Sequence, residues 1–493
     1  MEQTEIKEPE TAEKLLSALK ALYDGMLQAE NDKKQAIDHV RPTNNISAVN
    51  LVDYLALRSK NVEPLQVQLH QLGLSSMASS ESHIKSHICQ ILERLGHLPI
   101  ENCGTDASSG AKLLQQHIFK LFGKTGDQEV PPIMVTFDTN FAKDAELVSL
   151  LLQNGMRVAR INCAHDDQAI WSEMIASLEQ AKTQTGLPCK IYMDMAGPKI
   201  RTEIIGKKKP HNKLKVKLGQ EVLLAEPGKK AVKGVKFISC TLPGIIGNLA
   251  SGQRVLMDDG LFEAIVQSVQ NNEALLKITH ISAAKPVIKS EKGLNFPDTA
   301  FKANPITEYD RKCLPFILSH ADMLGFSFVN SAADLELLQK HLDLLNKPDF
   351  AVVAKIETGQ AVKNLPEILL QGLQHSQFGV MVARGDLAIE IGFERMSEIQ
   401  DEILWLCEAA HVPVIWATQV LENMNKNGIA TRGEITDAVH AASADCVMLN
   451  KGDHIVEVMR TLSDILRRSR KNSLKNRRLF RKLSIAQHFI NGG

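Results

Sequence analysis

Charged side chains directly follow short apolar runs in this chain of 493 residues. Lys355 and Glu357 come after the apolar residues 351–354, and Asp386 follows the apolar residues 378–382. Carboxylates at the ends of neighbouring strands can share one hard divalent cation and leave room on it for substrate and water. Because no cluster of cysteine and histidine suits zinc, Glu357 and Asp386 favour Mg2+, or Mn2+, as the metal.

Basic residues near these carboxylates indicate a ligand that carries negative charge. Arg160, Arg201 and Lys355 each lie at or just after an apolar run. Two or three cations beside a metal suit a transferring phosphoryl group, because negative charge spreads over its oxygens. The sequence contains neither a Walker loop nor a kinase glycine-rich loop, so a nucleotide is held in another way or is not used.

The apolar runs themselves predict the elements that position these residues. From Pro132 onward, runs of four to six residues alternate with amphipathic stretches, which is typical of a parallel sheet with crossover helices. We expect strands at 133–137, 157–161, 190–193, 322–326, 351–354, 378–382, 413–417 and 445–449. Eight such strands predict a closed (β/α)8 barrel, which is an α/β fold.

A barrel of this kind gathers its chemistry at the carboxyl ends of its strands. Polar residues follow at least six of the eight runs. They are Arg160, Asn162, His165, Asp194, Lys199, Arg201, Ser327, Lys355, Glu357, Arg384, Gly385, Asp386, Thr418, Gln419, Asn450 and Lys451. Most of them alone would be explained as a helix cap, an ion-pair partner or a packed strand end, but a buried lysine such as Lys355 is costly without a task. The set together predicts a shared active site.

Three other segments flank or interrupt the barrel, which we place at residues 130–202 and 296–470. Residues 1–125 show helical periodicity and predict three or four helices, with Ser47 capping one of them. Residues 203–295 predict a small all-β domain inserted after the third barrel strand, with strands at 214–218, 221–225, 254–257, 262–269 and 274–278. Residues 471–493 form a basic tail without the aromatic platform that would favour nucleic acid.

Composition argues against several classes of function. Lys plus Arg and Asp plus Glu both number 57, so no net charge attracts nucleic acid or an anionic membrane. No apolar run is long enough to span a bilayer, and the acidic N-terminus resembles neither a secretory signal nor a transit peptide. The eight cysteines are scattered singly, which favours a reducing cytoplasm.

Several segments resemble motifs of the pyruvate kinase family, in the order in which that family has them. They are GMRVARIN (155–162), MDMAGPKIRT (193–202), MDDG (257–260), KGLNFP (292–297), AKIE (354–357), MVARGDLAIEI (381–391), ATQVLENM (417–424) and ATRGEITDAV (430–439). The resemblance covers about residues 130–470. It implies transfer of phosphate between phosphoenolpyruvate and a nucleoside diphosphate such as ADP, giving pyruvate and ATP.

The resemblance also implies a role for each matching residue. Lys355 would stabilise the phosphoryl group in flight, Arg160 and Arg201 would contact phosphate, and Glu357 and Asp386 would hold the metal. The other candidates are Thr418 on the face where the methyl proton arrives, Asp259 in a closing lid, and Asn162, His165, Asp194, Lys199, Ser327 and Gly385 around the bound cofactors.

Departures from the family pattern change the expected cofactors. Ala164, Met195 and Lys199 replace the serine, threonine and glutamate that usually surround K+ beside Asn162 and Asp194. We expect the ammonium of Lys199 to take the place of K+ and to balance Asp194, so activity should not require K+.

Other departures concern the nucleotide and the assembly. Ala196 removes one cation, and residues 137–139 and 450–452 replace the usual loops after the first and eighth strands. We do not expect the C-terminal domain that carries the sugar-phosphate site in many members of the family, and a homo-oligomer would form through the barrel or the N-terminal helices. Two alternatives stay open: another Mg2+-dependent enolate enzyme on the same barrel, such as an aldolase or a different phosphotransferase, and a non-catalytic regulatory protein.

Overall fold

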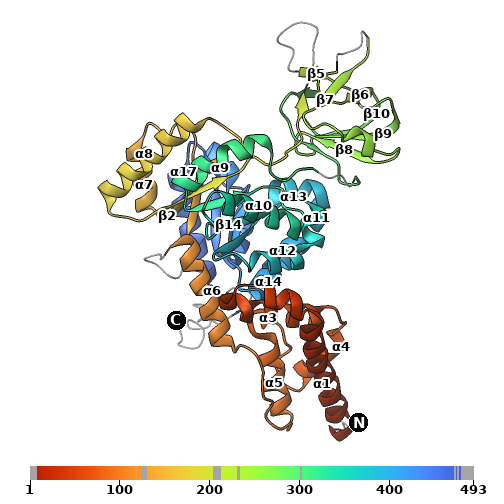
Figure 1. Cartoon of the computed structure of the whole chain (residues 1–493), viewed down its shortest axis with the longest axis vertical. Helices are drawn as coiled ribbons and strands as arrows, with labels where there is room; N and C mark the ends of the chain where they lie inside the picture. Colours follow the sequence, from red (N-terminus) through yellow and green to blue (C-terminus); the bar gives the residue numbers. More distant parts are fainter. Residues whose placement is uncertain are drawn as a thin grey trace, which may run out of the picture.

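The computed structural model describes residues 8–123, 130–203, 213–229, 234–299 and 303–470, and the backbone of 473–474 and 477–478. Figure 1 shows three parts along the longest axis: a barrel in the middle, a β domain at one end and a group of helices at the other. Apart from the two-residue strands β18 (Ser473–Leu474) and β19 (Arg477–Arg478), the predicted basic tail lies outside the described residues.

Eight parallel strands close into the central barrel, which confirms the predicted fold class. The strand order is β1-β17-β16-β15-β14-β13-β3-β2. The strands are β1 (Ile133–Thr136), β2 (Met156–Asn162), β3 (Lys190–Asp194), β13 (Met323–Phe326), β14 (Ala351–Ile356), β15 (Phe378–Ala383), β16 (Val414–Ala417) and β17 (Cys446–Leu449). All eight predicted runs form strands, because a strand buried on both faces is a nearly continuous apolar run.

Helices connect the barrel strands and cover their outer face. They are α7 (Ala145–Gln153), α8 (Gln168–Thr185), α9 (Glu308–His320), α10 (Ala332–Leu344), α11 (Gly359–Lys363), α12 (Leu365–Gly372), α13 (Arg384–Ile391), α14 (Met396–Ala409), α15 (Glu422–Asn427), α16 (Arg432–His440) and α17 (Ile455–Arg470). Local sequence fixes their ends: the side chain of Asp167 accepts from the first backbone amides of α8, and Gly186 ends that helix in the left-handed region.

The inserted β domain lies between β3 and β13. Its main sheet has the order β12-β8-β9-β10-β6-β7-β4, and β11 pairs with β5 beside it. The strands are β4 (Thr202–Glu203), β5 (Lys213–Lys215), β6 (Glu221–Ala225), β7 (Phe237–Cys240), β8 (Arg254–Met257), β9 (Phe262–Gln270), β10 (Glu273–Ile281), β11 (Val287–Lys289) and β12 (Leu294–Asn295). The five predicted strands are present, and four others, β4, β7, β11 and β12, were missed. The domain has an apolar core of its own.

The N-terminal part contains more helices than the three or four predicted. Six α-helices lie within residues 8–123: α1 (Glu8–Asp32), α2 (Lys34–His39), α3 (Asn45–Arg58), α4 (Glu63–Gln71), α5 (Ile84–Arg94) and α6 (Ala107–Phe122). The predicted cap Ser47 is wrong, since α3 begins at Asn45 and Ser47 lies buried inside its first turn. There the Ser47 hydroxyl is 3.0 Å from His411 Nδ1, so it serves the contact with the barrel instead.

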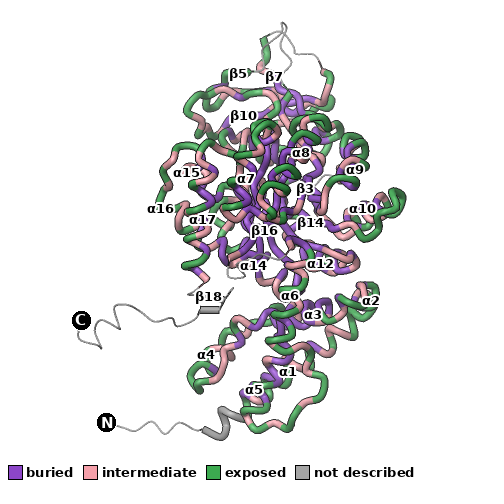
Figure 2. The backbone as a smooth tube through the Cα atoms, turned by 90° about the vertical axis from the view of Figure 1, so that its left-hand side faces the viewer, coloured by how far each residue is buried: buried purple, intermediate pink, exposed green. Residues whose placement is uncertain are grey.

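Helix α6 closes the amino end of the barrel. Its residues Leu114, Ile118, Leu121 and Phe122 pack in one buried cluster with side chains from inside the barrel, Met134 among them. Figure 2 shows this buried region where α6 meets the barrel. Helix α6 therefore supplies part of the barrel core.

One expectation about cysteine is corrected. Cys89 on α5 and Cys103 form a disulfide with a Cα–Cα distance of 6.1 Å, whereas the sequence led us to expect eight unpaired cysteines. The pairing depends on the turn that follows α5, which sequence spacing alone does not reveal. No helix in the described ranges is long and apolar enough to cross a membrane.

Candidate active site

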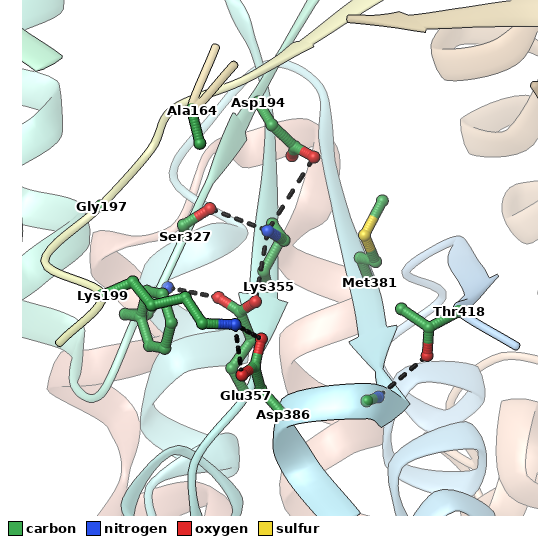
Figure 3. Close-up of polar contacts among 12 residues, drawn as sticks. Ala164, Asp194, Gly197, Lys199, Ser327, Lys355, Glu357, Met381, Asp386 and Thr418 are labelled. Atoms are coloured by element: carbon green, nitrogen blue, oxygen red, sulfur yellow. Dashed lines mark hydrogen bonds and ion pairs between the residues drawn. The ribbon is translucent and has the colours of Figure 1, made fainter. Parts of the chain in front are cut away.

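The buried charges of the barrel gather at the carboxyl ends of β2, β3 and β14. Figure 3 shows Asp194, Ser327, Lys355 and Glu357 converging there, with Asp386 beside them. Since these residues end or follow different strands, the closed barrel brings them together, as the positional rule for such folds requires.

Lys355 lies at the centre of this group. Its Nζ donates to Ser327 Oγ at 2.8 Å and lies 3.2 Å from Glu357 Oε1 and 3.9 Å from Asp194 Oδ2. Burial opposes the charge on this side chain, but Asp194 and Glu357 outweigh it and raise the pKa of Lys355. The lysine is therefore a fixed, desolvated cation.

Asp194 is already neutralised by other residues. Its Oδ2 accepts from Arg160 Nε at 2.6 Å, and its Oδ1 accepts from the Tyr192 hydroxyl at 2.5 Å. Burial opposes ionisation of Asp194, yet the charges of Arg160 and Lys355 lower its pKa below the usual value. Arg160 also donates to Thr136 Oγ1 at 3.0 Å, so β1, β2 and β3 are linked at this mouth.

Glu357 is also buried and belongs to the same cluster of charged side chains. Its Oε2 accepts from the backbone amide of Phe328 at 2.7 Å. Burial raises the pKa of Glu357, and the neighbouring Asp386 raises it further. Figure 3 shows the carboxylates of Glu357 and Asp386 beside each other, which is what a shared cation requires.

The prediction that Lys199 balances Asp194 is wrong in this structure. Lys199 Nζ lies on the two carboxylate oxygens of Asp386, at 2.7 and 3.0 Å (Figure 3). The loop after β3 turns at Gly197 (φ +66°), where an added Cβ would lie 2.9 Å from Ser327 Cβ. This turn directs the following lysine away from β3 and across to α13, and Asp194 has Arg160 instead.

Thr418 occupies a strained position beside Gly385. Its φ is +66°, which a β-branched residue rarely adopts. Its Oγ1 accepts from the backbone amide of Gly385 at 2.9 Å (Figure 3). The carboxyl end of β16 is thereby tied to the first turn of α13, which carries Asp386.

Arg384, which the sequence places among the polar residues of the barrel mouth, supports this turn together with Asp437, which was not a candidate. Arg384 forms an ion pair with Asp437, donates to the carbonyl of Ala417 at 3.0 Å and lies 4.5 Å above the Trp416 ring. The signal was present, since both residues fall within the quoted motifs MVARGDLAIEI and ATRGEITDAV.

Arg201 and Asn162 form hydrogen bonds with residues outside the Lys355 cluster, although Asn162 is paired with Asp194 across β2 and β3. Arg201 donates from Nη1 to the carbonyl of Glu291 at 3.1 Å, and Asn162 Oδ1 accepts from the amide of Ala164 at 3.1 Å. Burial lowers the pKa of His165, and the charges of Arg201 and then Lys451 lower it further. Arg201 and Lys451 thus add positive charge to the surroundings of His165, which follows β2.

Asp259 brings the inserted domain close to the site. A Cβ added to Gly293 would lie 3.4 Å from Lys199 Cε and 3.8 Å from both Asp259 Oδ1 and Asn295 Oδ1. Asn295 also donates to Glu390 Oε1 of α13 at 2.9 Å. The MDDG turn and β12 therefore border the loop that carries Lys199.

The residues present fit a hard divalent cation that keeps several ligands from water or substrate. Glu357 and Asp386 supply carboxylate oxygens, the donor type that Mg2+ prefers. Within the part of the chain that the structure describes, no group of three or more His, Cys, Asp or Glu residues could enclose a metal. A cation at this site would therefore be held by two carboxylates, with its other positions left for further oxygen ligands such as water or substrate.

The closed barrel of eight parallel strands with its connecting helices places the chain in the class of (β/α)8 proteins. The model of the pyruvate kinase barrel domain matches residues 132–454. The chain therefore belongs to the pyruvate kinase family.

Curated relatives carry the same family name. The chain is 32% identical over 326 residues to a pyruvate kinase of Geobacillus stearothermophilus, covering 65% of this chain and 53% of that protein. It is 31% identical to one from Staphylococcus saprophyticus, over 66% of this chain and 54% of that protein. For one from Thermotoga maritima the values are 29%, 66% and 68%. The chain thus spans about half the length of the first two relatives.

Proposed function

We propose that this chain transfers a phosphoryl group between phosphoenolpyruvate and a nucleoside diphosphate, giving pyruvate and ATP, with Mg2+ or Mn2+ as cofactor. The observation that carries the proposal is the buried Lys355, 3.2 Å from Glu357 and 2.8 Å from Ser327. A desolvated cation held by fixed partners stabilises a passing phosphoryl group more strongly than a solvated one would. Membership of the family supports the same reaction.

Each residue has a distinct task in this proposal. Lys355 stabilises the negative charge of the phosphoryl group, and Arg160 holds its oxygens from the side of β2. Glu357 and Asp386 hold the metal, which when bound would act as a Lewis acid on the substrate oxygens. Thr418 lies beside the first turn of α13, where it would orient the group that delivers the methyl proton.

We also propose that the inserted domain, residues 203–295, acts as the lid. Asp259 and Asn295 border the site from this domain, so a small movement of the domain would change access to Lys199 and Asp386. Arg201, at the start of the insertion, and His165 would meet the phosphates of the nucleotide. An assembly through the barrel or the N-terminal helices stays a prediction.

Independence from K+ remains part of the proposal, but for a changed reason. The charge of Asp194 is balanced by Arg160 and Lys355, not by Lys199. Ala164 and Met195 offer no side-chain oxygen for a monovalent cation. We therefore expect that added K+ changes neither binding nor turnover.

The test measures pyruvate release from phosphoenolpyruvate and ADP with Mg2+, with and without K+. We expect turnover in both conditions and its loss in Lys355→Ala. Lys190→Ala is a matched control. Lys190 forms an ion pair with Asp322, with 2.7 Å between Nζ and Oδ1, and this pair is not part of the site. Turnover that survives in Lys355→Ala would contradict the role of this lysine, and a requirement for K+ would contradict the balance of charge around Asp194.

A second candidate, a different Mg2+-dependent enolate enzyme, depends on the loops after β1 and β17. Lys451 lies 3.7 Å from Asp138, which joins the two loops that depart from the family pattern. If these loops do not accept a nucleotide, the same metal and lysine would serve another reaction through an enolate. Absence of turnover with any nucleoside diphosphate, despite metal binding, would support this candidate.

A further inference from the structure

The ion pair between Lys199 and Asp386 places an ammonium group on a carboxylate that the proposed function assigns to the metal. Both oxygens of Asp386 are engaged, at 2.7 and 3.0 Å. The side chains of Lys199 and Asp386 are 25% and 18% exposed, so the pair lies at the open side of the site. The deeper carboxylate, Glu357, is engaged by Lys355 and the amide of Phe328.

The ammonium of Lys199 also acts on Glu357. Its charge is among those that lower the pKa of Glu357 against the effect of burial. Lys199 therefore contributes positive charge to both carboxylates, as a divalent cation between them would. A cation that uses the oxygens of Asp386 cannot occupy the same place as the ammonium, because the two like charges repel and compete for the same lone pairs.

A second carboxylate, that of Asp259, lies near the aliphatic part of the Lys199 side chain. The point where a Cβ on Gly293 would stand lies 3.4 Å from Lys199 Cε and 3.8 Å from Asp259 Oδ1. Asp259 belongs to the turn between β8 and β9 of the inserted domain. The two side chains therefore flank the same glycine, and a rotation of the flexible lysine side chain would turn its ammonium from Asp386 towards Asp259.

We propose that Lys199 is a tethered cation that competes with the divalent metal for Asp386 and, when displaced, pairs with Asp259 of the inserted domain. The inference rests on the proposed function only in taking Glu357 and Asp386 as the metal carboxylates. In this arrangement metal binding and the docked position of the inserted domain favour each other, because the metal displaces Lys199 from Asp386 and the displaced lysine pairs with Asp259.

The experiment measures the affinity for Mn2+ alone, without substrate, by electron paramagnetic resonance or calorimetry. Lys199→Met should bind Mn2+ about fivefold tighter than the wild type, since a partly exposed ion pair of modest strength no longer competes. Lys292→Met is the matched control. Lys292 pairs with Asp258 at 2.9 Å, next to Asp259, so its removal lowers the local positive charge equally but leaves Asp386 untouched. Its Mn2+ affinity should stay close to that of the wild type.

The second position of the lysine is tested by Asp259→Asn. This variant should bind Mn2+ more weakly than the wild type, and the difference should vanish when Lys199→Met is also present. Equal Mn2+ affinity in wild type and Lys199→Met, or equal gains in Lys199→Met and Lys292→Met, would overturn the inference. So would a lack of Mn2+ binding to every variant. Tighter binding to Lys199→Met without any pyruvate formation would instead support the inference and contradict the proposed reaction.

Discussion

Lys355 lies near the end of β14 and Glu357 directly follows its last residue, and the ammonium of Lys355 lies 3.2 Å from a carboxylate oxygen of Glu357. Residues separated by two positions on a strand point to the same face, so both side chains face the inside of the barrel mouth. Each is buried and each compensates the charge of the other. Removing one of them therefore changes stability as well as chemistry.

Lys355→Met should lower turnover by roughly 10²–10³-fold and the free energy of unfolding by about 3 kcal/mol, because Glu357 and Asp194 lose a buried partner. The double variant Lys355→Met/Glu357→Gln should recover part of the stability and none of the turnover. Denaturant unfolding and pyruvate release measure the two effects. A single variant as stable as the wild type would show that Arg160 alone compensates both carboxylates.

Thr418→Gly separates strain from function. Glycine adopts a positive φ freely, which gains about 1 kcal/mol, while loss of the hydrogen bond to the Gly385 amide costs a similar amount. We expect an unfolding midpoint close to that of the wild type and a turnover at least about tenfold lower, because the first turn of α13 loses its link to β16. Unchanged turnover would mean that the strained threonine serves the fold alone.

Leu121→Ala tests the closure of the barrel by α6. Leu121 is 1% exposed and lies in the core cluster shared with the barrel, so its truncation should cost about 2–5 kcal/mol. Leu98→Ala is the control, since Leu98 is 79% exposed. Equal stability of the two variants would show that α6 does not belong to the barrel core.

The buried imidazole of His375 should make the free energy of unfolding depend on pH. Burial lowers the pKa of His375 to about 4, and the charge of Arg41 adds to the effect. In the unfolded chain the imidazole takes up a proton below about pH 6.5, so the unfolded state binds more protons and stability falls as pH decreases from 6.5 towards 4.

The loss from this one group should reach about 2 kcal/mol between pH 7 and pH 5. His375→Leu should lack that part of the pH dependence, which denaturant unfolding at both pH values measures. Its Nδ1 has no hydrogen-bond partner among the described residues, so the substitution leaves no polar group unpaired there. Parallel pH profiles for wild type and variant would contradict the expectation.

The sequence predicts the barrel well and the pairing of its charges poorly. Each barrel strand is an apolar run long enough to stand out, whereas β4 and β12 have two residues each and depend on their partners in the sheet. The positional rule for barrels gathers Lys355, Glu357 and Asp386 correctly at one mouth. It does not reveal which carboxylate a long lysine reaches, because that depends on the turn at Gly197.

The insertion between β3 and β13 has a consequence for the order of folding. These strands are neighbours in the barrel, although roughly 130 residues of chain separate them, and closing so long a loop costs entropy. The two ends of the insertion meet, with the amide of Leu294 donating to the carbonyl of Ile200 at 2.9 Å. Once the inserted domain has folded, the open loop shrinks to roughly 35 residues, which lowers the closure cost by about 1 kcal/mol. We therefore expect that Val266→Ala, in the core of the inserted domain, slows refolding of the barrel in stopped-flow experiments more than it speeds unfolding.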